Sequence, residues 1–218
     1  TIHMPDYCDE NSIIDFFSEN EQIKKKSNAL LAKAIKFARQ IKNINGRDVS
    51  IIISLSRLDN SINKFIYYDK IKKLTNKLQR QSINLLPQWL PVEAWYFGGN
   101  VKTRAFSDPK DLKYLKSIKL NICLDTSHFI LSCNFYKLNI TKYFTNYKKI
   151  FKHYHLSDAI NTDGEGVLIG RGQIIKSGLL EKILDDNKTI KVLETWQGHL
   201  DNLYNFKKDF KKIIKFLK

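Results

Sequence analysis

The sequence predicts an α/β fold with a parallel sheet, in which strands and helices alternate along the chain. Continuous apolar runs such as residues 49–55, VSIIISL, are typical of strands buried on both faces. Between these runs, apolar residues recur every three or four positions, as they do in helices. The regular alternation favours a closed barrel over an open sheet. The absence of a GxGxxG motif and of a P-loop leaves a nucleotide-binding open sheet without support.

The first half of the chain carries the signals for two long helices. Ser18 and Glu21 fit a capping box at the start of the first helix, and the pair Asn45-Gly46 ends it. The other elements expected here are strands over residues 1–4, 49–55 and 83–86, a helix over residues 62–78, and loops over residues 5–17 and 89–100.

The second half continues the alternation. Asp108-Pro109 starts a helix, with proline at its first position. We further expect strands over residues 120–124, 153–155 and 189–193, and helices over residues 140–151, 174–184 and 206–217. No repeat or Pro/Gly/Ser-rich linker divides the chain, so residues 1–218 are predicted to form a single domain.

Composition limits the cellular setting. No run of about 18 apolar residues is present, so no membrane partner is expected. The N-terminal residues lack the pattern of a signal peptide. Cys8, Cys123 and Cys133 are odd in number and lack CxxC spacing, which favours reduced thiols and a cytoplasmic location.

The net charge of +15 has two interpretations. One is a nucleic-acid partner. The other is a set of solvated helix faces, because the lysines are spread along the predicted helices and do not form one patch. We favour the second interpretation, since charge alone indicates non-specific binding, and a nucleic-acid partner is not expected.

A strand that ends in a histidine and opens into a glycine-rich acidic loop spans residues 153–174, HYHLSDAINTDGEGVLIGRGQI. The strand would hold His155 rigidly, and the glycines would let the backbone approach a substrate. The alternative is a half-buried strand followed by a turn with no function.

Polar side chains stand at or just after the ends of most predicted strands. In a closed parallel barrel these ends converge on one face, where active sites lie. Each residue also has a structural explanation, such as a helix cap for Asp125. Together, carboxylate oxygens and imidazole nitrogens are ligands for Zn²⁺, Mn²⁺ or Co²⁺. The residues are His3, Gln88, Asp125, His128, His155 and Glu194.

Four segments carry a family resemblance: CLDTSH at 123–128, HLSDA at 155–159, the GEG and IGRG loop at 164–172, and LETW at 193–196. In this order they resemble the xylose-isomerase-like TIM-barrel superfamily, which includes sugar phosphate isomerases and epimerases and the endonuclease IV type of DNA-repair enzyme. The resemblance covers nearly the whole chain. It implies a (β/α)8 barrel that lacks its first β/α unit, because the chain begins near the end of the second strand.

The resemblance also implies a divalent metal ion (Mn²⁺, Zn²⁺, Co²⁺ or Mg²⁺) held by residues of the fourth, fifth, sixth and eighth strands. The corresponding ligands are Gln88, Asp125, His155 and Glu194. Gln88 departs from the family pattern, which has a glutamate there, and Glu93 could replace it only if the loop folds back. A glutamine can ligate a metal but cannot abstract a proton, which puts epimerisation in doubt.

The first function implied is a metal-dependent isomerase or epimerase that acts on a sugar or sugar phosphate. Glu194 would be the general base, and His128 or His3 would orient the substrate or carry a proton. The segment Gly170-Arg171-Gly172 would hold a phosphate. Trp95 would stack on a sugar ring or form part of a lid.

Two alternatives remain open. Gln88 and the missing unit are compatible with a non-catalytic barrel that keeps its metal shell. An endonuclease IV-like phosphodiesterase fits the positive charge, but five histidines are few for its three-zinc cluster. Under each of these functions, the missing unit predicts a fragment, a partner that supplies the unit, or a distorted barrel that closes around the gap. A homo-oligomer is a candidate for covering the open seam.

Overall fold

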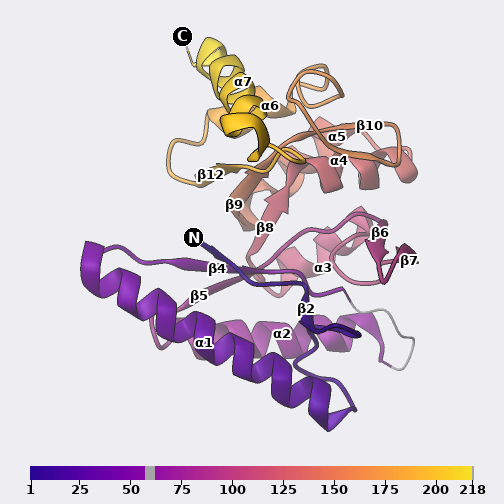
Figure 1. Cartoon of the computed structure of the whole chain (residues 1–218). Coiled ribbons are helices and arrows are strands. Elements are labelled where there is room, and N and C mark those ends of the chain that lie inside the picture. Colours follow the sequence, from indigo (N-terminus) through magenta and orange to yellow (C-terminus); the bar gives the residue numbers. More distant parts are fainter. Residues whose placement is uncertain (57–61, 218) are drawn as a thin grey trace.

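The computed structural model describes residues 1–56 and 62–217. Two parallel three-stranded sheets lie side by side (Figure 1). A parallel bridge between Gln88 and Cys123 joins them. The first sheet has the order β1 (Ile2–His3), β4 (Ser50–Ile53), β5 (Asn84–Pro87), and the second has the order β8 (Ile122–Asp125), β9 (Phe151–Leu156), β12 (Ile190–Leu193).

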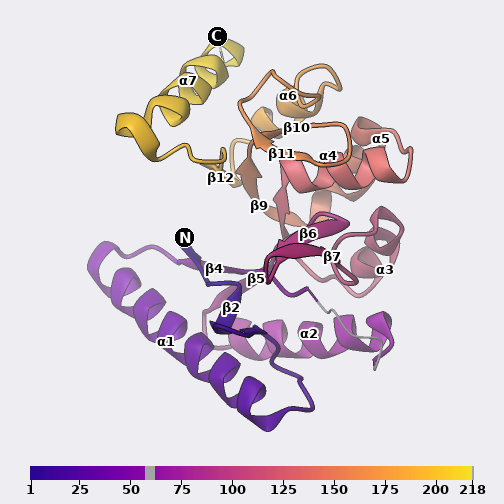
Figure 2. The same ribbon diagram turned by 45° about the vertical axis from the view of Figure 1, so that its right-hand side comes forward.

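Helices cover the outside of this curved arrangement. Helices α1 and α2 lie against the first sheet, and α4 to α7 surround the second (Figures 1 and 2). Their bounds are α1 Glu21–Asn45, α2 Lys64–Gln79, α3 Leu112–Ser117, α4 Thr126–Phe135, α5 Ile140–Tyr147, α6 Leu179–Leu184 and α7 Leu200–Phe216, with 3₁₀ turns η1 at Pro109–Asp111 and η2 at Lys148–Ile150. Helix α7 is kinked at residues 201–203, whose φ angles are positive.

The arrangement is a truncated barrel, as the sequence predicts. Among the described residues, six parallel strands follow one another as in a TIM barrel, and β1 and β12 are the edge strands. One detail of the strand numbering needs correction. His155 and Glu194 were expected on strands six and eight, but β9 and β12 pair directly, so these residues come from adjacent strands.

Side chains alternate between the two faces of each strand, and they therefore form two separate apolar cores. Ile51 and Ile53 of β4 belong to the large apolar core that includes residues of the helices, whereas Ile52 packs with Leu86 and Cys123 inside the barrel. All three isoleucines of β4 are fully buried. This confirms the expectation that residues 49–55 contain a strand buried on both faces.

Several local predictions need correction. The N-cap of α1 is Asn20, whose side chain accepts from the N–H groups of Gln22 and Ile23, so the capping box of Ser18 and Glu21 does not form. The expected helix over 174–184 covers only α6. The expected loops contain antiparallel hairpins: β2 (Tyr7–Asp9) with β3 (Ser12–Ile13), and β6 (Glu93–Tyr96) with β7 (Gly99–Lys102).

No helix within the described parts of the chain combines the length and apolar character needed to cross a bilayer.

Candidate functional site

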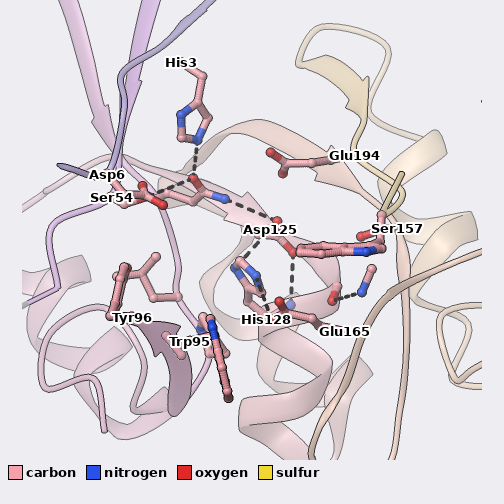
Figure 3. Close-up of a pocket in the computed structure, with 17 residues that line it drawn as sticks. His3, Asp6, Ser54, Trp95, Tyr96, Asp125, His128, Ser157, Glu165 and Glu194 are labelled. Atoms are coloured by element: carbon pink, nitrogen blue, oxygen red, sulfur yellow. Dashed lines mark hydrogen bonds and ion pairs between the residues drawn. The ribbon is translucent and has the colours of Figure 1, made fainter. Parts of the chain in front are cut away.

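A cavity of about 650 Å³ lies at the carboxyl ends of the parallel strands. Five of the six polar residues singled out from the sequence line it: His3, Gln88, Asp125, His128 and Glu194 (Figure 3). The sixth, His155, is buried with 3% exposure and contacts Glu194. The strand-end residues therefore converge as expected for a barrel.

A chain of hydrogen bonds crosses the cavity wall. Nε2 of His3 lies 2.6 Å from Oε1 of Gln88, and the Gln88 amide donates to Oδ2 of Asp125 at 3.3 Å (Figure 3). Asp125 also caps α4, since its Oδ1 accepts from the N–H of His128 at 3.0 Å. Gln88 thus directs its carbonyl oxygen at His3. Glu93, the alternative to Gln88, is exposed on β6 and does not line the cavity.

His155 and Glu194 approach each other without forming a hydrogen bond. Nδ1 of His155 lies 2.6 Å from Oε2 of Glu194, yet both atoms are buried and neither has a hydrogen-bond partner among the described residues. The two atoms are therefore close neighbours that no hydrogen bond joins. Burial lowers the pKa of His155 to about 4, so its ring is neutral at pH 7.

Asp125 and His128 carry perturbed ionisation. Burial and the nearby Glu194 carboxylate together raise the pKa of Asp125 to about 6, against the lowering effect of the His128 imidazolium. Burial alone would lower the pKa of His128, but the carboxylates of Asp125, Glu165 and Glu194 outweigh it and raise the pKa to about 10. His128 is therefore an imidazolium at neutral pH, with Nδ1 donating to the Trp89 carbonyl at 3.0 Å.

Glu165 lies in the glycine-rich segment and faces His128. No function was predicted for it from the sequence. It belongs to β11 (Gly164–Val167), which forms a hairpin with β10 (Asp158–Ile160) over the cavity. Its Oε2 lies 3.5 Å from Nε2 of His128, and this contact lowers the pKa of Glu165. An acid between two glycines was the only signal in the sequence.

The donor set fits a divalent metal ion. His3, His155 and Glu194 each offer a ligand atom, and these atoms lie within 4.8 Å of one another. The unpaired atoms of His155 and Glu194 are the observation that carries the fit, because buried polar atoms in native proteins are usually paired. Asp125 lies beside Glu194 at the same wall.

The glycine-rich segment needs a correction at its phosphate-binding residues. The N–H groups of Gly170 and Gly172 both donate to the buried carboxylate of Asp158 at 2.8 Å, and neither residue lines the cavity. Arg171 is exposed and also lies outside the cavity lining. The segment does form an anion-binding nest, but its anion is Asp158 of the same chain.

Aromatic side chains form the rim of the cavity. Trp95 lines it and is 67% exposed, and Trp196 lines it with 66% exposure. Trp89, by contrast, is fully buried and packs edge-to-face on Phe129, so it belongs to the core. The two exposed tryptophans are positioned to contact a ligand in the cavity.

Neither the family models nor the curated proteins provide a match for this chain. Solved structures do. A D-tagatose 3-epimerase-like protein is 16% identical with a TM-score of 0.63, over 99% of this chain and 76% of its own. The probable 3-DHS dehydratase AsbF involved in petrobactin synthesis, from Bacillus anthracis, is 14% identical with a TM-score of 0.64, over 98% and 76%.

A xylose isomerase domain protein from Alicyclobacillus acidocaldarius is 12% identical with a TM-score of 0.55, over 93% of this chain and 75% of its own. At such identities the similarity concerns the fold. The strand order, the converging strand ends and these neighbours together give this chain the fold of the xylose-isomerase-like TIM-barrel superfamily, in a truncated form.

Proposed function

We propose that the protein is a metal-dependent isomerase or epimerase-type enzyme that acts on a small sugar in the cavity at the strand ends. The observation that carries the proposal is the convergence of unpaired ligand atoms of His155 and Glu194, joined by His3, beside that cavity. Its neighbours in fold include a D-tagatose 3-epimerase-like protein, which supports a sugar as the substrate class.

The metal would be held by His3, His155 and Glu194, whose ligand atoms converge, and Asp125, which lines the cavity beside Glu194, would complete the set. A bound divalent ion supplies Lewis-acid polarisation of a substrate carbonyl or hydroxyl oxygen. Gln88 supports this set from outside, because its side chain bridges His3 and Asp125. The identity of the ion stays open among Mn²⁺, Zn²⁺, Co²⁺ and Mg²⁺.

Glu194 and His128 would carry out the proton transfers. Glu194 takes the proton from the carbon next to the carbonyl, and His128 donates a proton to the carbonyl oxygen, which gives an enediol. The Nδ1–H of His128 is engaged by the Trp89 carbonyl, so the proton that moves is the one on Nε2. Glu165 keeps this imidazole charged and oriented. Return of the proton from Glu194 to the former carbonyl carbon, with loss of the neighbouring hydroxyl proton to His128, forms the new carbonyl, regenerates both groups and completes an isomerisation.

Gln88 favours a second candidate, the elimination of water. Epimerisation needs a proton acceptor on each face of the substrate, and an amide at position 88 cannot act as one. A dehydration needs one base and one acid, which Glu194 and His128 supply. The similarity to a probable dehydratase agrees with this candidate.

A phosphate-free sugar fits the cavity better than a sugar phosphate. The described residues that line the cavity include no lysine or arginine. The backbone nest at residues 170–174 already holds Asp158. Trp95 and Trp196 would instead stack on a sugar ring at the rim.

The test begins with metal content by mass spectrometry of purified wild type, Glu194→Gln and His155→Ala, with Glu181→Gln on the exposed face of α6 as the control. After loading with Mn²⁺, which favours oxygen ligands, we expect about one Mn²⁺ per chain in the wild type and the control, and a loss in both site variants. Deuterium uptake from D₂O into ketoses and aldoses, followed by NMR, then reports proton abstraction whichever product forms.

Metal without deuterium uptake on any sugar would favour a non-catalytic barrel that keeps its metal shell. Chelator-sensitive nicking of an abasic-site duplex would favour the phosphodiesterase. A cytoplasmic location and a homo-oligomer that covers the open edge stay predictions, and light scattering of the purified protein tests the latter.

A further inference from the structure

A second group of metal-ligand side chains lies inside the barrel, beside the cavity but not lining it. Cys123, His153 and His155 place ligand atoms within 4.8 Å of one another. Cys123 and His153 are register partners on β8 and β9, and His155 lies two residues further along the same face of β9. Their exposures are 0%, 0% and 3%, and none of the three lines the cavity.

His153 is the unusual member of this group. Neither of its ring nitrogens has a hydrogen-bond partner among the described residues, although the side chain is fully buried. A neutral imidazole carries one donor and one acceptor, and each costs about 1–3 kcal/mol when it is buried unpaired. Valine, isoleucine and leucine usually fill the interior of such barrels. The neighbouring Ile52 and Leu86 follow that rule, and His153 breaks it.

The chemistry of the three side chains selects a soft cation. One thiolate and two imidazoles are typical ligands of Zn²⁺, whereas Mg²⁺ and Mn²⁺ favour oxygen. Ligand atoms around one tetrahedral zinc ion lie about 3.5 Å apart, since each is about 2.0–2.3 Å from the metal. Separations within 4.8 Å therefore close by small side-chain movements. Burial raises the pKa of the Cys123 thiol, and the backbone N–H of His155, which faces the sulfur, offsets part of that rise.

The open edge of the barrel gives an ion a route to this group. Ile190 and Val192 on the edge strand β12 are the register partners of His153 and His155, and they are 50% and 36% exposed. Register partners share a face of the sheet. The interior beside the two histidines is therefore reached from solvent past β12.

We propose that Cys123, His153 and His155 form a second, buried site for Zn²⁺ within the barrel. The site shares His155 with the set at the cavity, so an ion held inside withdraws this imidazole from Glu194. The two sites thus compete, and a thiophilic ion favours the inner one. The inner site needs no sugar chemistry, and Cys123 and His153, which belong to it alone, let its test be separated from that of the proposed function.

Cobalt(II) is the probe, since a Co²⁺–thiolate bond gives a near-ultraviolet charge-transfer band that oxygen and nitrogen ligands do not give. Reduced, metal-free protein is titrated with Co²⁺ at mildly alkaline pH, because binding must displace the thiol proton, and Zn²⁺ is then added. We expect the band in the wild type and its bleaching by Zn²⁺. Cys123→Ser should abolish the band and His153→Leu should weaken Co²⁺ affinity at least tenfold.

Cys133→Ser is the matched control, because Cys133 is also a buried free thiol but lies on α4 outside the group. It should keep the band, and so should Glu194→Gln, which removes only the cavity ligand. Circular dichroism and urea denaturation check that each variant folds. If Cys123→Ser does not fold, His153→Leu and Cys133→Ser decide the question. Absence of the band in the wild type, or its loss in Glu194→Gln, would overturn the proposal.

Discussion

Asp158 is expected to hold the glycine-rich segment in place, and Asp158→Asn tests this. The carboxylate is fully buried. Its Oδ1 accepts from the N–H groups of Ala159, Gln173 and Ile174, and its Oδ2 accepts from those of Gly170 and Gly172. All five distances are 2.7–2.8 Å.

The magnitude follows from counting donors. Asparagine keeps one oxygen and replaces the other with NH₂, so at least two N–H groups lose their acceptor. The smaller loss places NH₂ against Gly170 and Gly172. Each buried N–H without an acceptor costs about 1–3 kcal/mol, which gives about 2–6 kcal/mol in total. We expect a loss in the free energy of unfolding near the lower end of this range, because the hydrogen bond from the Gly170 N–H is only partly buried.

Urea denaturation followed by tryptophan fluorescence measures the change in the free energy of unfolding. Asp163→Asn is the control, since Asp163 is an exposed aspartate in the same segment. We also expect faster proteolysis within residues 161–174 in Asp158→Asn alone. A loss below about 0.5 kcal/mol in a folded Asp158→Asn protein would refute the account of Asp158 as the anion of this nest.

Three further predictions concern single side chains. Gly172→Ala should destabilise the fold by more than about 2 kcal/mol, because the added Cβ would lie 1.9 Å from the Ala159 carbonyl oxygen, and urea denaturation measures this. Gln88→Glu should tighten metal binding and increase deuterium uptake, since it restores a second carboxylate near Asp125, and calorimetry with Mn²⁺ tests the binding. Burial lowers the pKa of His153 to about 3 from 6.5, so metal-free protein should lose stability as the pH falls below about 6.5. Between pH 7 and 5 the loss due to His153 should be about 1–2 kcal/mol, the lower value allowing for solvent screening at the open edge, and the pH dependence of unfolding should be flatter by this amount in His153→Leu.

The strand ends could be predicted because their signals are local. An apolar run followed by a polar residue marks the end of a buried strand, and this rule located Gln88, Asp125 and Glu194. His155 was predicted from the alternation of HYH, and its strand runs one residue further, to Leu156. Helix α4 was not predicted, because it is buried on most sides. Its residues Phe129, Ile130 and Leu131 are all buried and show no amphipathic period.

The hairpins and the nest depend on tertiary contacts. Glu165 reaches His128 only because β11 folds back on β10 over the cavity, and hairpins with such short strands give no periodic signal. The N–H groups of Gly170 and Gly172 have the geometry expected of an anion site. Sequence spacing could not reveal that Asp158, twelve residues before Gly170, fills it.

Gln88 connects the electrostatics of the site to its chemistry. A glutamate here would add a third carboxylate beside Asp125 and Glu194, where burial and the Glu194 carboxylate already raise the pKa of Asp125 to about 6. The amide avoids that repulsion, donates to Asp125 and accepts from His3, so it orders the wall of the cavity without an added charge. The same substitution removes a proton acceptor from one face of any bound sugar. A site arranged in this way is suited to reactions that need only one base, Glu194, and one acid, the His128 imidazolium. Inversion of configuration at carbon would need a second proton acceptor, which Gln88 does not supply.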